Sequence, residues 1–247
     1  MKEMRLTTVV ASVNDNVEYF GFIPYQIRIW ASFQIRFLAV FVGQKIPDEL
    51  SPYIDNIILW DRNQGLHPVY LGQHLRIYFP ALLSLPDDEM VMITDIDMLP
   101  TSDGFYKKGM ETFEKDDFIY FRFIEGNQMF MCYNSAHPSV WSKLFGVVTV
   151  DDVENRLREN YPSTYDGTPG GQGWFSDQEL LFRTLIHYEH LKILDRPHRR
   201  LTREEFCDHL GQNDEGFLSR YDDFHAHRNF TNNKDLILEL MKRIETP

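Results

Sequence analysis

A short apolar run, Met90–Ile93, is followed almost at once by two aspartates, Asp95 and Asp97. An uninterrupted apolar run of this length is typical of a buried strand, and ligands of open α/β sheets gather at the carboxyl ends of such strands. Side chains two positions apart on an extended chain point to the same side. The pattern therefore predicts that both carboxylates face one point and suit a Mg²⁺ or Mn²⁺ ion holding a phosphorylated substrate. The alternative is a solvated acidic turn, because Asp and Pro are common in loops.

Strand-like and helix-like segments alternate in the first part of the chain. This alternation predicts βαβ units and an α/β fold with a mixed, mainly parallel central sheet flanked by helices. We expect helices at Pro24–Phe33 and Tyr70–Leu85, the second interrupted by Pro80 because proline lacks a backbone N–H. The expected strands are Thr7–Ala11, Phe37–Val42, Asn56–Trp60 and Met90–Thr94.

The second half has a different pattern. Phe118–Phe123 and Met129–Tyr133 flank EGNQ and predict antiparallel strands, and hence a small antiparallel sheet, with a helix after His137. Two further strands, Leu191–Leu194 and Phe224–Ala226, and a C-terminal helix from about Asp235 are also expected.

Residues 161–174 form a Gly- and Pro-rich segment that fits neither a helix nor a strand. A helix with Ser176 as its cap and Glu179 at its third position is expected directly after it. We interpret Tyr161–Gly173 as a mobile lid over a substrate, because long loops in compact domains are usually functional or disordered.

Length and charge limit the classes of protein that this chain fits. We expect one domain over residues 1–247, with a nucleotide-binding half (1–100) and a sugar- and acceptor-binding half (101–247). The formal charge is −12, which argues against nucleic-acid partners, whereas a bound cation would reconcile an acidic protein with an anionic nucleotide. The only cysteines are Cys132 and Cys207, which is consistent with a reducing compartment. No secretory signal or membrane span is apparent, so we expect a soluble, cytoplasmic protein.

Several motifs occur in an order that resembles the nucleotide-sugar glycosyltransferases of the GT-A fold, closest to the branch of glycogenin and the bacterial lipopolysaccharide galactosyltransferases. The resemblance covers most of the chain from Thr7 to His227. The motifs are VVASVND, LGQHLRIYFPALLSLPDDEMVMITDIDMLP, GNQMFMCYNSAHPSVW, SDQELL and the late HAH.

The resemblance implies a metal-dependent transfer of a sugar from a nucleoside diphosphate sugar, in this branch a UDP-sugar, to a glycan or another hydroxyl acceptor. It implies that Asp177 and Gln178 face the transferred sugar. The implied donor-binding residues are Ala11, Ser12, Asn14, Arg76, Asp95, Ile96 and Asn127. The implied ligands of Mn²⁺, or of Mg²⁺, are Asp95 and Asp97 with His225 or His227.

The sequence also departs from the pattern of the family. The Lys-Pro-Trp that follows the family's histidine is absent, with Arg228 in that place, and Phe182 stands where an Asn is usual. These departures put the phosphate contact and the sugar pocket in doubt and support a non-catalytic nucleotide-sugar-binding module as an alternative. The other alternative is a haloacid dehalogenase-type phosphohydrolase with Asp95 as nucleophile, although that motif usually continues Gly-Thr near the N-terminus.

Individual residues have other possible roles. Arg76 could be a surface cation, and Asn127 could turn a hairpin, since Gly and Asn favour turns. The aromatic residues Trp174, Phe175 and Tyr165 are expected either in the core or stacked on a sugar ring. The basic stretch Arg196–Arg200 is expected on a solvated face or near the diphosphate.

Overall fold

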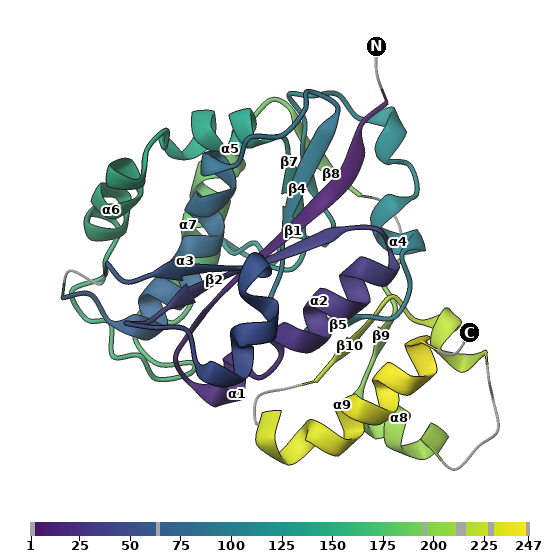
Figure 1. Cartoon of the computed structure of the whole chain (residues 1–247). Coiled ribbons are helices and arrows are strands. Elements are labelled where there is room, and N and C mark those ends of the chain that lie inside the picture. The colour runs from purple at the N-terminus through teal and green to yellow at the C-terminus, as the bar shows by residue number, and fades with distance from the viewer. Residues whose placement is uncertain (1–2, 63–64, 195–196, 211–215, 227–229, 246–247) are drawn as a thin grey trace.

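The computed structural model describes residues 3–62, 65–194, 197–210, 216–226 and 230–245, and a seven-stranded sheet lies at its centre (Figure 1). The strands of this sheet are β1 (Arg5–Asn14), β2 (Arg36–Val42), β3 (Ile57–Trp60), β4 (Glu89–Ile93), β6 (Phe118–Tyr120), β7 (Asn134–Ala136) and β8 (Leu191–Ile193). Their order is β3-β2-β1-β4-β7-β6-β8, and β7 runs antiparallel to both of its neighbours while the other paired strands are parallel. The predicted mixed, mainly parallel sheet is therefore confirmed.

Both faces of this sheet are covered, which explains why its strands are apolar without interruption. On β2, Phe37 and Phe41 pack into the hydrophobic core on one face. Leu38 and Val40, one position along, pack into the core on the other face. This period of two is the strand geometry, in which successive side chains point to opposite sides.

Helices form the layers on either side. The core on one face includes residues of α1 (Val17–Phe20), α2 (Ile23–Ser32), α4 (Gly104–Lys107), α8 (Arg203–Leu210) and α9 (Phe230–Glu245). The core on the other face includes residues of α3 (Pro68–Tyr78), α5 (Pro138–Phe145), α6 (Val150–Glu159) and α7 (Ser176–Leu185) (Figure 1). Short 3-10 segments lie at Asp48–Asn56, Phe79–Leu82, Met110–Thr112 and Phe217–Arg220.

A second, three-stranded sheet joins the two halves of the chain. It contains β5 (Met98–Pro100), β10 (Asp223–His225) and β9 (Arg200–Leu201) in that order. Its central strand β10 is antiparallel to β5 and parallel to β9. A small second sheet is therefore present, but it is not built from the two antiparallel strands predicted for the second half. It includes one parallel pair and takes one strand from directly after Asp97, whereas β6, from the predicted strand Phe118–Phe123, belongs to the seven-stranded sheet.

The region before β7 corrects the prediction of a strand over Met129–Tyr133. The strand begins only at Asn134, and its register pairs Tyr120 with Asn134. The Asn134 amide donates to the carbonyls of Phe130 and Met131, both at 2.9 Å, and the Phe130 N–H donates to the Tyr120 hydroxyl at 2.8 Å. Side chains thus satisfy backbone groups that a strand partner would otherwise bond.

Two helix boundaries also differ from the prediction. The helix predicted to continue to Leu85 ends at Tyr78 and tightens into the 3-10 segment Phe79–Leu82, where Pro80 has no N–H to continue the α-helical bonding. The C-terminal helix begins at Phe230 rather than near Asp235. No helix of the described part of the chain is both long and apolar enough to cross a membrane.

Candidate active site

A cavity of about 520 Å³ lies where β1 and β4 end, at the carboxyl edge of the parallel strands. Open α/β sheets bind ligands at this edge because neighbouring connections leave the sheet to opposite faces there. Its walls come from the ends of β1 and β10, from α3, from the segment after β4 and from the start of α7. The polar and aromatic lining includes Ser12, Asn14, Tyr19, Gln73, Arg76, Asp95, Asp97, Trp174, Phe175, Asp177, Gln178 and His225.

Helix α3 approaches β1 closely through Gly72. A Cβ at Gly72 would lie 3.3 Å from the backbone nitrogen of Asn14, tighter than ordinary van der Waals contact. The Ser12 hydroxyl donates to the Gly72 carbonyl at 2.5 Å and accepts from the Arg76 backbone N–H at 3.0 Å. Ser12 therefore fastens α3 to the end of β1 and sets the position of Arg76.

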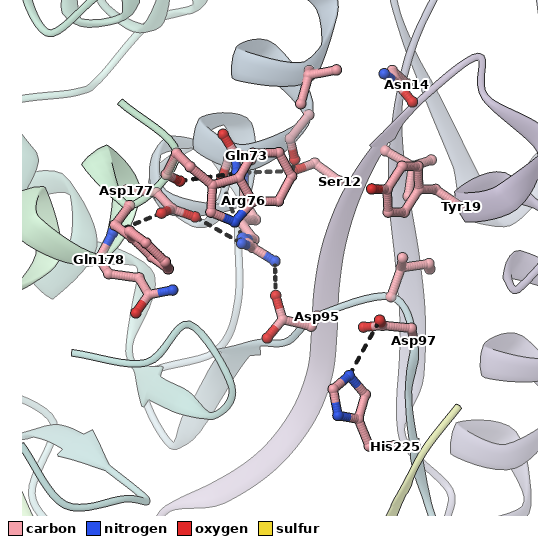
Figure 2. A pocket seen from close by; sticks show the side chains of 16 residues that line it. Ser12, Asn14, Tyr19, Gln73, Arg76, Asp95, Asp97, Asp177, Gln178 and His225 are labelled. Atoms are coloured by element: carbon pink, nitrogen blue, oxygen red, sulfur yellow. Dashed lines mark hydrogen bonds and ion pairs between the residues drawn. The ribbon is translucent and has the colours of Figure 1, made fainter. Parts of the chain in front are cut away.

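The Arg76 guanidinium lies between two carboxylates (Figure 2). It donates to Asp177 Oδ2 at 2.8 Å and to Asp95 Oδ1, and its Nε donates to the Gln73 carbonyl at 3.1 Å. Arg76 is only 8% exposed, which excludes the alternative of a surface cation. Burial opposes its charge, but Asp95 and Asp177 more than compensate and raise the pKa of Arg76.

Asp177 is buried at the start of α7, with an exposed fraction of 1%. Its Oδ1 accepts the backbone N–H of Gln178 at 2.8 Å. Burial raises the pKa of Asp177, whereas the charge of Arg76 acts in the opposite direction. Asp177 is therefore not an exposed carboxylate that only complements the helix dipole.

Ser176 does not cap α7 as predicted. It is the first residue of the helix, and the capping position is taken by Phe175, which makes no side-chain cap hydrogen bond. The Ser176 backbone N–H instead donates to the Gly173 carbonyl at 3.0 Å, and its hydroxyl lies 3.4 Å from His74 Nε2. The turn from Gly173 to Ser176 thus starts the helix one residue earlier than the capping pattern indicated.

Asp97, which directly precedes β5, lies close to His225, the last residue of β10. His225 Nε2 lies 3.4 Å from Asp97 Oδ2, and Figure 2 shows Asp97 beside Asp95 with His225 below them. Among the described residues no group of three or more His, Cys, Asp or Glu side chains is gathered as a metal site, since Asp95 is directed to Arg76. Carboxylate oxygens with one imidazole nitrogen still form a donor set that fits a divalent ion such as Mn²⁺. His227 lies outside the described residues.

Of the remaining predicted donor-binding residues, two line the cavity and two do not. Asn14 and Ile96 line the cavity, and the Ile96 carbonyl accepts from the buried Gln26 amide at 2.8 Å. Ala11 is fully buried within β1 and is not part of the lining. Asn127 is exposed in the turn bounded by the Glu125–Gln128 bridge, also away from the cavity lining, as the hairpin alternative indicated.

Among the polar and aromatic lining residues, sequence reasoning missed two, Tyr19 on α1 and Gln73 on α3 (Figure 2). Their signal was Gly72, because an isolated glycine inside a helical pattern often marks a close backbone approach. The aromatic residues also separate into two kinds. Trp174 and Phe175 line the cavity, whereas Tyr165 is buried and its hydroxyl donates to Gln73 Oε1 at 2.6 Å.

No protein-family model and no curated protein matches this sequence. Solved structures do match. The galactosyltransferase LgtC, in complex with donor and acceptor sugar analogues, aligns with a TM-score of 0.52 at 13% identity over 98% of this chain and 97% of LgtC. An active-site mutant of LgtC aligns with a TM-score of 0.50 at 13% identity over 96% of this chain and 95% of that one.

The apo form of the glycosyltransferase GlyE from Streptococcus pneumoniae TIGR4 aligns with a TM-score of 0.51 at 11% identity. The alignment covers 97% of this chain but 62% of GlyE, so this chain spans less than two thirds of that protein. At these identities the likeness establishes the fold. The chain therefore has the GT-A fold that its motifs predicted.

Proposed function

We propose that this protein is a metal-dependent glycosyltransferase that moves a sugar from a nucleoside diphosphate sugar, most simply a UDP-sugar, to a hydroxyl group of a glycan acceptor. The observation that carries this proposal is the joining of Asp95, Arg76 and Asp177, three residues from distant parts of the chain, in one cavity at the carboxyl edge of the sheet. The GT-A fold shared with LgtC and GlyE supports the same activity.

The two sides of the cavity suit the two parts of such a donor. Asn14, at the end of β1, and Tyr19, on α1, offer an amide and a ring for a nucleoside. Asp177 and Gln178 lie on the opposite side in Figure 2, where they would meet the transferred sugar. A cavity of about 520 Å³ has the size of sites for small ligands and cofactors.

The charged groups are arranged for breaking the bond between the sugar and the diphosphate. Positive charge grows on the sugar ring as this bond breaks, and a fixed carboxylate such as Asp177 stabilises it. Arg76 holds Asp177 in place at 2.8 Å and contributes positive charge to the site of the departing diphosphate. Trp174 and Phe175 add two aromatic side chains to the lining of the same cavity.

Asp97 and His225, with Asp95, are the residues that would hold a divalent cation. When bound, such a cation supplies Lewis-acid stabilisation of the negative charge on the leaving diphosphate. It would also attract an anionic nucleotide to a protein of net charge −12.

Titration with UDP in the presence of Mn²⁺ or of excess chelator tests this proposal at the level of binding. Mn²⁺ should raise the affinity for UDP by about tenfold or more, the scale of one charge-assisted contact. Asp97→Asn should remove this increase. Asp87→Asn, the same change at the opposite end of β4 where the side chain is 84% exposed, should leave it intact. Undiminished UDP affinity in chelator would contradict a metal-assisted donor site.

The alternatives predict different results. In a phosphohydrolase Asp95 would attack phosphorus, yet its Oδ1 accepts from Arg76, which favours an electrostatic role over a nucleophilic one. A covalent phospho-intermediate on Asp95 would establish the phosphohydrolase. A non-catalytic module would bind the nucleotide sugar without releasing a nucleoside diphosphate.

A further inference from the structure

A second cavity, of about 670 Å³, lies beside the first along the same edge of the sheet. Its lining comes from the residues that directly follow β6 and β8, including Arg122, Phe123 and Leu194. Strand β7 is antiparallel to β4 and β6, and β6 is parallel to β8, so β4, β6 and β8 all end at this edge. The topology therefore places a second ligand-sized space next to the one that contains Asp95.

The lining of this second cavity combines cationic and apolar groups. Arg122 and Arg200 line it together with Phe123 and Ile193, which are 62% and 50% exposed. Solvent-exposed aromatic and aliphatic side chains beside guanidinium groups suit a ligand that has both an apolar face and an anionic group.

The two arginines differ in how their charge is balanced. Arg200 donates to Asp223 Oδ1 at 3.0 Å, and His198 Nε2 lies 2.9 Å from Asp223 Oδ2. Arg122 lies over the Phe130 ring, 4.7 Å from its centroid, and 3.5 Å from the Cys132 sulfur. No carboxylate in the described part of the chain pairs with Arg122. Arg122 therefore brings to the cavity a positive charge that none of the described carboxylates neutralises.

The buried Cys132 thiol lies next to both arginines of the second cavity. Its sulfur is 3.5 Å from Arg122 Nη1 and 3.8 Å from Arg200 Nη2. Cys132 stands two positions before Asn134, which pairs with Ile93 at the end of β4. The segment that leads into β7 therefore separates the second cavity from the end of β4.

We infer that the second cavity binds the acceptor, and that this acceptor is a sugar carrying an anionic group, phosphate or carboxylate, which pairs with Arg122 while its ring packs on Phe123 and Ile193. The assignment of this sugar as the acceptor rests on the proposed function. The binding of an anionic sugar at Arg122 does not depend on it. Arginine is suited to this role because its planar guanidinium bonds both kinds of anion with two parallel hydrogen bonds.

Ligand-observed NMR titration of the whole protein, without donor, tests the inference with three probes: glucose 6-phosphate, glucuronate and glucose. At least one anionic sugar should bind about tenfold or more tightly than glucose, the scale of one charge-assisted hydrogen bond. The tighter of the two identifies the anion as phosphate or carboxylate. Arg122→Gln should abolish this preference.

Arg199→Gln is the matched control. Arg199 directly precedes the lining residue Arg200, but it is 55% exposed and is not part of the lining. It should keep the preference for the anionic sugar. Equal binding of all three probes, no binding, or equal losses in the two arginine variants would overturn the inference. Failure of UDP to bind in the presence of Mn²⁺ would instead contradict the proposed function. It would not change the conclusion about binding of anionic sugars at Arg122.

Discussion

The Arg76 guanidinium on α3 donates to the Asp177 carboxylate on α7 at 2.8 Å, across 101 positions of the chain. Their side chains are 9% and 2% exposed, so the ion pair lies within the protein at the wall of the cavity. The start of α7 and the loop before it are thereby held against the sheet that contains Asp95. In our proposal this pair sets the geometry of the site and also contributes to stability.

Removing the cation of this pair should destabilise the protein. Arg76→Gln leaves Asp177 buried beside Asp95 without compensation, so we expect the free energy of unfolding to fall by about 3 kcal/mol in urea denaturation. Arg62→Gln, which breaks the solvent-exposed pair with Glu154, is the control and should change the free energy of unfolding far less, because exposed ion pairs contribute little to stability. Adding Asp177→Asn to Arg76→Gln should recover part of the loss, and simple additivity of the two changes would contradict this coupling.

His74 should make stability depend on pH on the acid side. It is fully buried, stacks on Tyr70 and lies on α3 close to Arg76. Burial lowers the pKa of His74 from 6.5 to about 3. Between these values the unfolded chain binds a proton that the folded protein does not, so the free energy of unfolding falls as the pH falls through this window, by up to about 1.4 kcal/mol per pH unit.

The measurement is urea denaturation of wild type and His74→Gln between pH 7 and about pH 4. The wild type should lose stability more steeply with falling pH than the variant, because glutamine has no proton to bind. His187→Gln, at an exposed position, is the control and should keep the slope of the wild type. Parallel curves for wild type and His74→Gln would show that the imidazole is not held neutral.

The loop Tyr161–Gly173 should become more resistant to protease when the cavity is filled. It is attached to α3, because the Tyr165 hydroxyl donates to Gln73 and the Gln73 amide donates to the Trp174 carbonyl at 3.1 Å. Gln73 and Trp174 both line the cavity, so a ligand there would add contacts to this attachment. We expect limited cleavage by a broad-specificity protease to slow severalfold with UDP and Mn²⁺.

Tyr165→Phe provides a second variant for this experiment. It removes the 2.6 Å hydrogen bond to Gln73 and should speed cleavage of the empty protein. Equal cleavage of the loop with and without ligands would count against a role as a lid.

Much of the fold could be predicted because its signals are local. The strands around Phe37 and Met90 show both faces buried in a continuous apolar run, and Asp95 follows the second of these directly. Turn and cap signals were less reliable. Asn127 could be interpreted as a sugar contact or as a turn, and the structure decides for the turn, because the Glu125–Gln128 bridge closes around Asn127 and leaves it exposed.

The site could be predicted as a set of residues but not as an arrangement. Neither the burial of Asp177 nor its pairing with Arg76 has a local signature, since both depend on how α7 packs on α3. The same holds for Arg122. It follows β6, and its place near the site depends on β6 and β4 ending at the same edge of the sheet. Long-range packing decides these features, and sequence spacing does not record it.

The central claim is that the cavity transfers a sugar from a nucleoside diphosphate with the help of Asp177. The most direct test measures the nucleoside diphosphate released from a panel of UDP-, GDP- and ADP-sugars, with Mn²⁺ and a mixture of neutral and anionic sugar acceptors. We expect release from one donor by the wild type and a rate at least about a hundredfold lower in Asp177→Asn, the scale of losing one transition-state electrostatic contact. A change of less than about threefold in Asp177→Asn, or an undiminished rate in excess chelator, would contradict the account.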